Sequence, residues 1–239
     1  MSKKLLIFFV VELIMLSLLI ATRVCGWGSI ADLAFKTLAS MAFVAMGITG
    51  LCEVKNNGEN ANREVSVKYA KSIIGGLVCA LLGDVFLDIP SDGSIFFIIG
   101  VACFAFAHVC YSIGFFKVAC LKAVDFLVML GVFGITLCFL LFGGTFEFKG
   151  LFPVLLGYAA IISFMVAKAI SLYRNKDVRK QAYVHTLVGA LLFIASDIIL
   201  LYCLFGVNTP LYMTIFNLIT YYLGQAFIAS PLGKGVLKD

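Results

Sequence analysis

Charged residues are scarce in this 239-residue chain, and their scarcity excludes most soluble proteins. Only 13% of the residues are charged, 62% are hydrophobic, and the mean hydropathy is +1.08. A soluble domain of this length needs far more polar side chains to cover its surface. We therefore expect an integral membrane protein, with any activity located within or at the edge of the bilayer.

Several catalytic and metal-binding motifs are also missing. The two histidines lie in distant segments and cannot supply a three-ligand zinc site, and the eight cysteines form no C-x-x-C pair. Neither a G-x-S-x-G motif nor a phosphate-binding glycine loop is present. Gly83-Asp84 resembles part of the G-x-G-D motif of intramembrane aspartyl proteases, but Leu81 replaces its first glycine. The sequence therefore predicts neither a metal nor an organic cofactor.

Apolar runs predict eight membrane-spanning helices, because roughly 20 apolar residues cross a hydrocarbon core about 30 Å thick. The first two are the weakest, since Glu12, Asp32 and Lys36 interrupt them. We expect Glu12 and Lys36 to be tolerated or to snorkel toward the interface, and Asp88 to be solvated or to have a helix-end role. The predicted spans are 5–21, 30–51, 70–89, 94–116, 124–142, 151–172, 184–206 and 210–230.

The distribution of Lys and Arg predicts that both termini are cytoplasmic, because cytoplasmic loops carry an excess of these residues. In that orientation only Arg23, Lys36 and Lys149 fall on the outer side. The net charge of +5 therefore reflects membrane orientation rather than a nucleic-acid-binding surface. Residues 1–21 resemble a signal peptide, but Ala21-Thr22-Arg23 is a poor cleavage site, so we expect a retained helix.

The predicted connections are short, with one exception. Residues 53–68 form a polar cytoplasmic segment that we expect to be flexible, whereas the outer connections cover only 90–93, 143–150 and 207–210. No extramembrane domain remains to host chemistry. The small loops favour a bacterial cell membrane over the eukaryotic endoplasmic reticulum.

Two matching segments indicate an internal duplication. Residues 72–89 contain Asp84 and residues 185–202 contain Asp197, 113 positions later. A glycine lies eight residues before each aspartate, and a leucine three residues after it. The sequence therefore predicts an all-α polytopic protein forming one membrane domain, 1–239. Within it, residues 1–116 and 124–230 form two parallel four-helix pseudo-repeats.

Asp84 and Asp197 are the predicted catalytic residues. A carboxylate within a membrane-spanning helix is costly, so it usually faces a cavity or a partner and serves a function. If the two meet near the centre, one can act as an acid and the other as a base at neutral pH. The alternative is a pair of hydrogen bonds that pack helices together.

A second set of polar side chains could line a wet cleft for a lipid headgroup. Three of them follow four-residue spacing on the last span and share one helix face. Hydrogen bonding between helices is the alternative for each of them, and core packing is favoured for His108. The candidate substrate-binding residues are His108, Tyr111, Ser196, Asn217, Tyr221, Tyr222 and Gln225.

Four short motifs, in this order, together resemble the YhhN family of membrane lysoplasmalogenases. They are L-G-D-V-F-L (82–87), F-A-H-V-C-Y (106–111), A-S-D-I-I-L (195–200) and Y-Y-L-G-Q-A (221–226). The resemblance covers roughly residues 70–230. It implies that the protein hydrolyses the vinyl ether bond of lysoplasmalogens. These substrates are lysophospholipids, and they reach the protein from the surrounding membrane lipid. It also implies that the two motif aspartates are the essential pair.

Vinyl ether hydrolysis suits such a pair, because it begins with protonation of an alkenyl carbon and continues with attack by water on an oxocarbenium ion. A proton-coupled transporter is the alternative, since repeats and midplane acids also suit alternating access. An intramembrane aspartyl protease is the third candidate.

Overall fold

The computed structural model describes residues 2–56, 61–89, 94–148, 150–207 and 209–238, and these form eight long α-helices. Each predicted span corresponds to one helix, which confirms the all-helical fold. Short 3₁₀ helices, Leu172–Arg174 and Leu232–Lys234, follow α6 and α8. The long helices are α1 (Lys3–Cys25), α2 (Ser29–Asn56), α3 (Ala61–Asp88), α4 (Ser94–Val118), α5 (Ala123–Phe142), α6 (Phe152–Ser171), α7 (Lys180–Phe205) and α8 (Leu211–Ala229).

The helices α1 to α7 are long and apolar enough to cross a membrane. Helix α8 is not among them. It has 19 residues and no charged residue, so its hydropathy, and not its length or charge, separates it from α1 to α7. The polar residues Asn217, Tyr221, Tyr222 and Gln225 lower that hydropathy, and three of them are buried against other helices. Helix α8 is therefore an inner helix with a polar face, as its four-residue spacing predicts.

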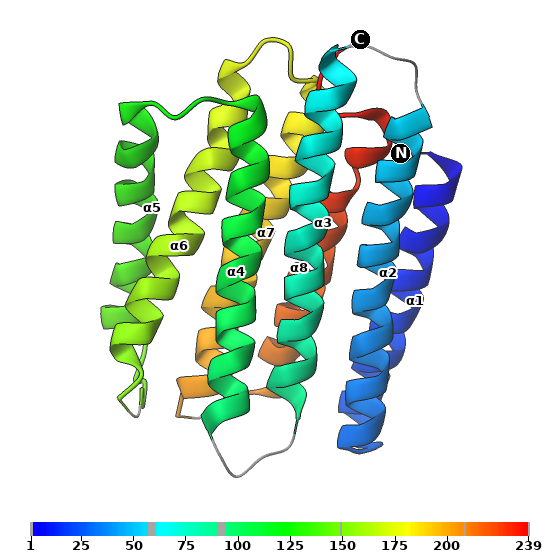
Figure 1. Ribbon diagram of the computed structural model, residues 1–239. Coiled ribbons are helices and arrows are strands. Elements are labelled where there is room, and N and C mark those ends of the chain that lie inside the picture. The colour runs from blue at the N-terminus through cyan, green and yellow to red at the C-terminus, as the bar shows by residue number, and fades with distance from the viewer. Residues whose placement is uncertain (1, 57–60, 90–93, 149, 208, 239) are drawn as a thin grey trace.

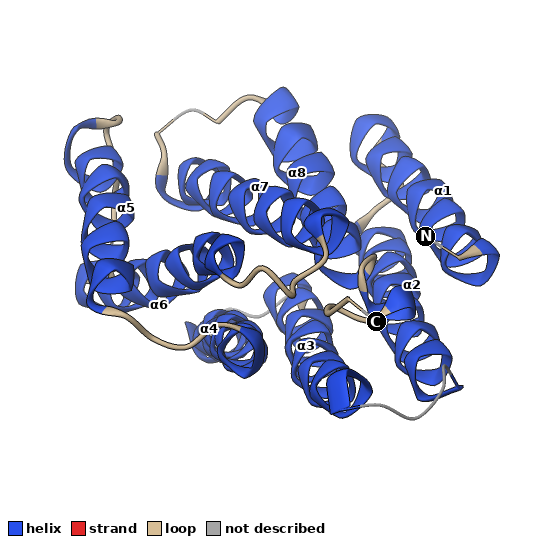
Figure 2. Cartoon of the chain, turned by 90° about the horizontal axis from the view of Figure 1, so that it is seen from above, coloured by secondary structure: helices blue, strands red, loops and turns tan. Residues whose placement is uncertain are grey.

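The helices form one upright bundle (Figure 1). Seen from above, α7 and α8 lie beside α3 and α4, with α5 and α6 at one side and α1 and α2 at the other (Figure 2). Both ends of the chain lie at the same end of the bundle, which we call the terminal end (Figure 1). The described residues that follow α1, α5 and α7, at 26–28, 143–148 and 206–207, lie at the opposite end (Figure 1). Which end faces the cytoplasm stays a prediction.

The polar connection predicted to be flexible is largely helical. Residues 53–56 continue α2 and residues 61–68 begin α3, while 57–60 lie outside the described residues. Glu64 and Lys68, one helical turn apart, form an ion pair of 2.6 Å on the exposed surface. Glu, Lys, Arg and Ala favour helix, so this segment extends the spans beyond the apolar core. The predicted connection 90–93 also lies outside the described residues, as do Lys149 and Asn208.

Glycines allow close approach in both central helix pairs. A Cβ atom at Gly76 of α3 would overlap the ring of Tyr111 on α4. A Cβ atom at Gly189 of α7 would lie 2.8 Å from the carbonyl oxygen of Gly224 on α8. Small residues let membrane helices pack at short distance. Both contacts join positions 35 residues apart, and the second contact repeats the first 113 positions later.

Polar contacts join neighbouring segments at the terminal end. The C-terminal segment crosses it, where the Arg179 amide donates to the Val236 carbonyl and the Lys238 amide donates to the Asp177 carbonyl. Nearby, the Lys168 ammonium lies 3.1 Å from Asp125 and is fully buried. The two hydrogen bonds tie the C-terminal segment to the start of α7, and the ion pair joins α5 to α6.

Candidate active site

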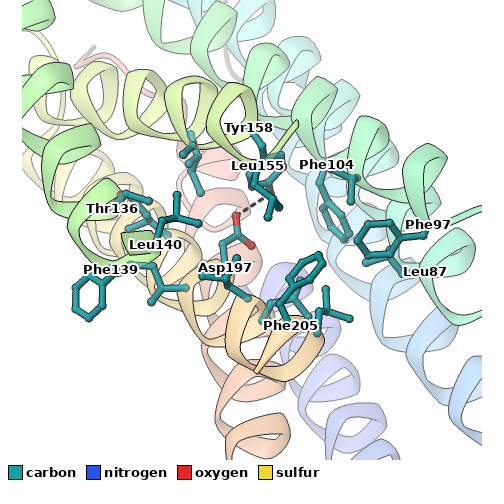
Figure 3. Close-up of a pocket in the computed structure, with 18 residues that line it drawn as sticks. Leu87, Phe97, Phe104, Thr136, Phe139, Leu140, Leu155, Tyr158, Asp197 and Phe205 are labelled. Atoms are coloured by element: carbon teal, nitrogen blue, oxygen red, sulfur yellow. Dashed lines mark hydrogen bonds between the residues drawn. The ribbon is translucent and has the colours of Figure 1, made fainter. Parts of the chain in front are cut away.

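Asp197 belongs to a group of three polar side chains from three helices. Helix α7 carries Asp197, α6 carries Tyr158 and α4 carries His108. The Tyr158 hydroxyl donates to Asp197 Oδ2 at 2.7 Å (Figure 3), and His108 Nε2 lies 2.9 Å from the Tyr158 hydroxyl. The same His108 nitrogen lies 3.5 Å from Asp197 Oδ2. Because each side chain contacts the other two, the carboxyl is held in one orientation.

This carboxyl forms part of the wall of an apolar cavity between α4, α5, α6 and α7, to which Leu87 of α3 also contributes (Figure 3). The cavity has a volume of about 80 Å³, enough for a few waters or a short length of hydrocarbon chain. Among its lining residues only Thr136, Tyr158 and Asp197 have polar side chains. The others are Leu87, Phe97, Val101, Phe104, Phe139, Leu140, Leu155, Ala159, Ile162, Ile194, Ile198, Leu200, Leu201, Leu204 and Phe205.

His108 lies behind the wall of this cavity. Its side chain is fully buried and packs edge-on against Phe193, with ring centroids 4.6 Å apart. Its Nδ1 atom has no hydrogen-bond partner among the described residues. His108 is therefore a core residue, as the sequence analysis favoured, and it is also a neighbour of Asp197.

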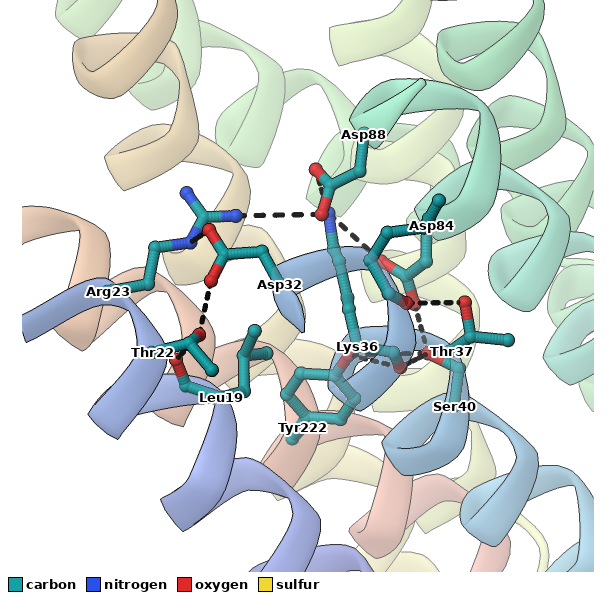
Figure 4. Close-up of polar contacts among 11 residues, drawn as sticks. Leu19, Thr22, Arg23, Asp32, Lys36, Thr37, Ser40, Asp84, Asp88 and Tyr222 are labelled. Atoms are coloured by element: carbon teal, nitrogen blue, oxygen red, sulfur yellow. Dashed lines mark hydrogen bonds and ion pairs between the residues drawn. The ribbon is translucent and has the colours of Figure 1, made fainter. Parts of the chain in front are cut away.

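Asp84 belongs to a separate polar group between α2, α3 and α8 (Figure 4). Its Oδ2 atom accepts hydrogen bonds from Ser40 at 2.6 Å and from Tyr221 at 2.7 Å. The Lys36 ammonium lies 3.8 Å from its Oδ1 atom. Asp84 is only 2% exposed and is not among the residues that line the cavity.

A charged network continues from Asp84 to the end of the bundle opposite the termini (Figure 4). Lys36 forms an ion pair of 2.9 Å with Asp88, which lies 3.5 Å from Arg23. Arg23 in turn pairs with Asp32 at 2.8 Å. Of the predicted alternatives, snorkelling of Lys36 and solvation of Asp88 are therefore wrong, because Asp84 and Asp88 of α3 hold the lysine inside the bundle. Glu12 is also buried, and neither carboxyl oxygen has a hydrogen-bond partner among the described residues.

Aromatic rings separate the two aspartate groups. Phe193 packs edge-on against Tyr221 with centroids 5.4 Å apart, and Phe104 packs against Tyr221 at 5.8 Å. Tyr221 bonds to Asp84 on one side, while Phe193 contacts His108 on the other. We call Phe104, Phe193 and Tyr221 the aromatic wall. Within the described part of the chain, no hydrogen bond joins the two carboxyl groups directly.

The remaining predicted site residues form bonds between or within helices. Tyr111 donates to Gln225 at 2.7 Å, joining α4 to α8, and Asn217 donates to the Ser196 carbonyl at 2.7 Å. Tyr222 donates to the Lys36 carbonyl at 3.0 Å. The lining residues of the cavity include none of these five side chains. Their assignment to substrate binding stays a prediction.

Sequence reasoning missed Tyr158, the residue that bonds directly to Asp197. A tyrosine hydroxyl in the otherwise apolar stretch 152–162 is the one signal that could have marked it. Across the described ranges, no three residues among His, Cys, Asp and Glu are arranged to hold one metal ion. A carboxyl group in an apolar wall can act as a general acid or base toward a reactive group of a bound molecule.

Comparison with known proteins gives one family assignment. No curated protein and no solved structure matches the chain. The model of the YhhN family matches residues 31–232, which include both aspartates, all of α3 to α8, and α2 apart from its first two residues. The chain therefore belongs to the YhhN family.

Proposed function

We propose that this protein is a membrane hydrolase that cleaves the vinyl ether bond of lysoplasmalogens, releasing a fatty aldehyde and a glycerophospho-base. The placement of Asp197 in the wall of an apolar cavity carries this proposal. An alkenyl chain is hydrocarbon up to the ether bond, so it matches the apolar lining of the cavity. A chain bound there would bring its double bond to the Asp197 carboxyl. Membership of the YhhN family supports the same activity.

The reaction needs a proton at carbon before water attacks. Asp197 would protonate C2 of the alkenyl chain, so that C1, which carries the ether oxygen, becomes an oxocarbenium ion. Water would then bond to C1 and return a proton to the Asp197 carboxylate. The hemiacetal would lose its hydroxyl proton and break the bond between C1 and the glyceryl oxygen, which takes up a proton. One water is consumed, and Asp197 ends protonated as it began.

Asp84 would act as the partner of Asp197 through the aromatic wall rather than by direct contact. Its carboxyl fixes the Tyr221 hydroxyl at 2.7 Å, and the Tyr221 ring supports Phe193. Phe193 in turn packs against His108 beside Asp197. We assign the proton transfer to Asp197, because it borders the cavity and Asp84 does not.

The two halves, 1–116 and 124–230, would be parallel repeats within one membrane domain. The repeated glycine contacts at an interval of 113 residues support this proposal. At the same interval, the cavity residues Thr136 and Leu201 correspond to Arg23 and Asp88. In the first half these two residues form an ion pair, and in the second half their equivalents line the cavity. This difference supports placing the reaction in the second half.

Localisation follows from topology. Both termini would be cytoplasmic, since most Lys and Arg residues lie at the terminal end. The cavity, near the opposite end, would then lie in the outer half of a bacterial cell membrane. A proton-coupled transporter is expected to have broken helices around a midplane site, whereas α1 to α8 are each continuous.

The proposal is tested by incubating detergent-purified protein with a lysoplasmalogen in D₂O and reducing the product at once to an alcohol. Protonation at carbon predicts aldehyde release with one deuterium at C2. Absence of aldehyde, together with movement of the lipid or of protons in proteoliposomes, would replace the hydrolase with the transporter. Aldehyde without deuterium at C2 would exclude carbon protonation.

A further inference from the structure

The two carboxyl oxygens of Asp197 have different surroundings. Oδ2 accepts from Tyr158 at 2.7 Å and lies 3.5 Å from His108 Nε2. Among the described residues no hydrogen bond reaches Oδ1, which points away from the bond to Tyr158 (Figure 3). One oxygen is therefore held by protein, while the other is free to meet a bound molecule.

The directions of these hydrogen bonds follow from the donors available. The Tyr158 hydroxyl donates its single proton to Asp197, so its oxygen can only accept from His108. His108 must therefore carry a proton on Nε2 to make the 2.9 Å contact. His108 thus donates to Tyr158, and Tyr158 donates to Oδ2 of Asp197.

We propose that Tyr158 and His108 are positioning residues, which fix Asp197 Oδ2 and stabilise the carboxylate formed when Oδ1 gives its proton to the alkenyl carbon. This inference rests on the proposed function. During the step the O–H bond at Oδ1 breaks and a C–H bond forms at C2. Both donor protons stay on Tyr158 and His108, and the proton from the attacking water returns to Oδ1. No further reactant is required.

Burial makes this arrangement effective. His108 is fully buried and Tyr158 borders a cavity whose other walls are almost entirely apolar. Hydrogen bonds to a charged group are stronger than neutral ones, and they strengthen further where water is excluded. Both donors are in place before reaction, so they need no rearrangement as charge develops on the carboxylate.

Four substitutions test this proposal. Tyr158→Phe removes the hydroxyl and keeps the ring, and it should lower kcat about 10- to 100-fold with KM changed by less than about threefold. His108→Leu should lower kcat similarly. His108→Gln keeps an N–H donor near the position of Nε2 and should restore kcat to within about fivefold of wild type. Tyr69→Phe is the matched control, because Tyr69 is a buried tyrosine whose hydroxyl contacts Thr186 away from the cavity.

A second measurement does not depend on activity. A carbodiimide should label Asp197 faster in Tyr158→Phe than in wild type or Tyr69→Phe, because Oδ2 loses its donor. The labelled peptide is measured by mass spectrometry. Equal labelling rates, or a wild-type kcat in Tyr158→Phe, would overturn the positioning role while leaving the hydrolase intact. If wild-type protein releases no aldehyde, the proposed function fails, and the labelling alone decides whether Tyr158 holds Asp197.

Discussion

Tyr221 and His108 lie 113 residues apart, and each contacts the aspartate of the opposite half. Tyr221 of α8 donates to Asp84 of α3 at 2.7 Å, whereas His108 of α4 lies 3.5 Å from Asp197 of α7. The same interval separates the two aspartates. Such exchange of equivalent contacts is the pattern expected where two similar units face each other across a two-fold axis.

The different surroundings of the two aspartates predict that substitution of Asp84 mainly lowers stability, whereas substitution of Asp197 mainly lowers kcat. Asp84→Asn should lower stability by about 1–3 kcal/mol, because it weakens a buried hydrogen-bond network. Its kcat should fall about tenfold through displacement of the aromatic wall, far less than for loss of an acid. Tyr221→Phe should reproduce both effects more weakly. Unfolding curves and turnover of the same preparations measure them, and a loss of activity in Asp84→Asn as large as that in Asp197→Asn would contradict the division of roles.

The ion pair between Lys36 and Asp88 predicts a strong coupling. Lys36→Met should destabilise the protein by about 3–5 kcal/mol, since it leaves buried carboxylates without their cation. Asp88→Leu combined with Lys36→Met should recover part of that loss. A double-mutant cycle on the free energy of unfolding measures the coupling. Additive effects of the two substitutions would show that the pair is not coupled.

Gly189 should tolerate no side chain. Gly189→Ala places a Cβ atom 2.8 Å from the Gly224 carbonyl oxygen, so α7 and α8 must separate. We expect a loss of about 1–3 kcal/mol, typical of overpacking. Gly157→Ala on α6 is the control, because a Cβ atom there meets nothing within 4 Å. If both variants unfold alike, the contact between Gly189 and Gly224 does not limit the side chain at position 189.

The cavity itself can be filled. Ala159 lines it and is 3% exposed, so Ala159→Leu should occupy part of the space beside Asp197. The value of kcat/KM for a long-chain lysoplasmalogen should fall about tenfold or more, as expected when a hydrophobic pocket loses volume. Val154→Leu changes an exposed position on the same helix and serves as the control. Unchanged kcat/KM in Ala159→Leu would place the substrate elsewhere.

The sequence predicted the eight helices well, because the length and polarity of each apolar run are set by the bilayer. Both aspartates were also noticed in the sequence, since a carboxylate is conspicuous in such a run, and their catalytic role stays a prediction. It could not pair Lys36 with Asp88, 52 residues away, because periodicity reports a helix face and not the helix that meets it. The prediction of a flexible connection is wrong for residues 53–56 and 61–68, since charged residues with high helix propensity continue a helix beyond the membrane.

Tyr158 illustrates the other limit of sequence reasoning. Its partners lie 39 and 50 residues away on two other helices. A single tyrosine in an apolar span has no periodic pattern, so only the packing of α4, α6 and α7 reveals that it holds Asp197. The shared pocket expected for the two aspartates also depended on packing, and the structure places Asp197 alone in the wall of the cavity.

Turnover of Asp197→Asn on lysoplasmalogen, measured as aldehyde released, tests the assignment of Asp197 as the acid most directly. Asparagine keeps the shape of the side chain and can still accept from Tyr158, but it has no proton acidic enough to give to carbon. We predict that kcat falls about 10²- to 10⁴-fold. Lysolipid affinity and thermal unfolding should stay close to wild type. Turnover within a few-fold of wild type would show that another group donates the proton and would remove Asp197 from the chemistry.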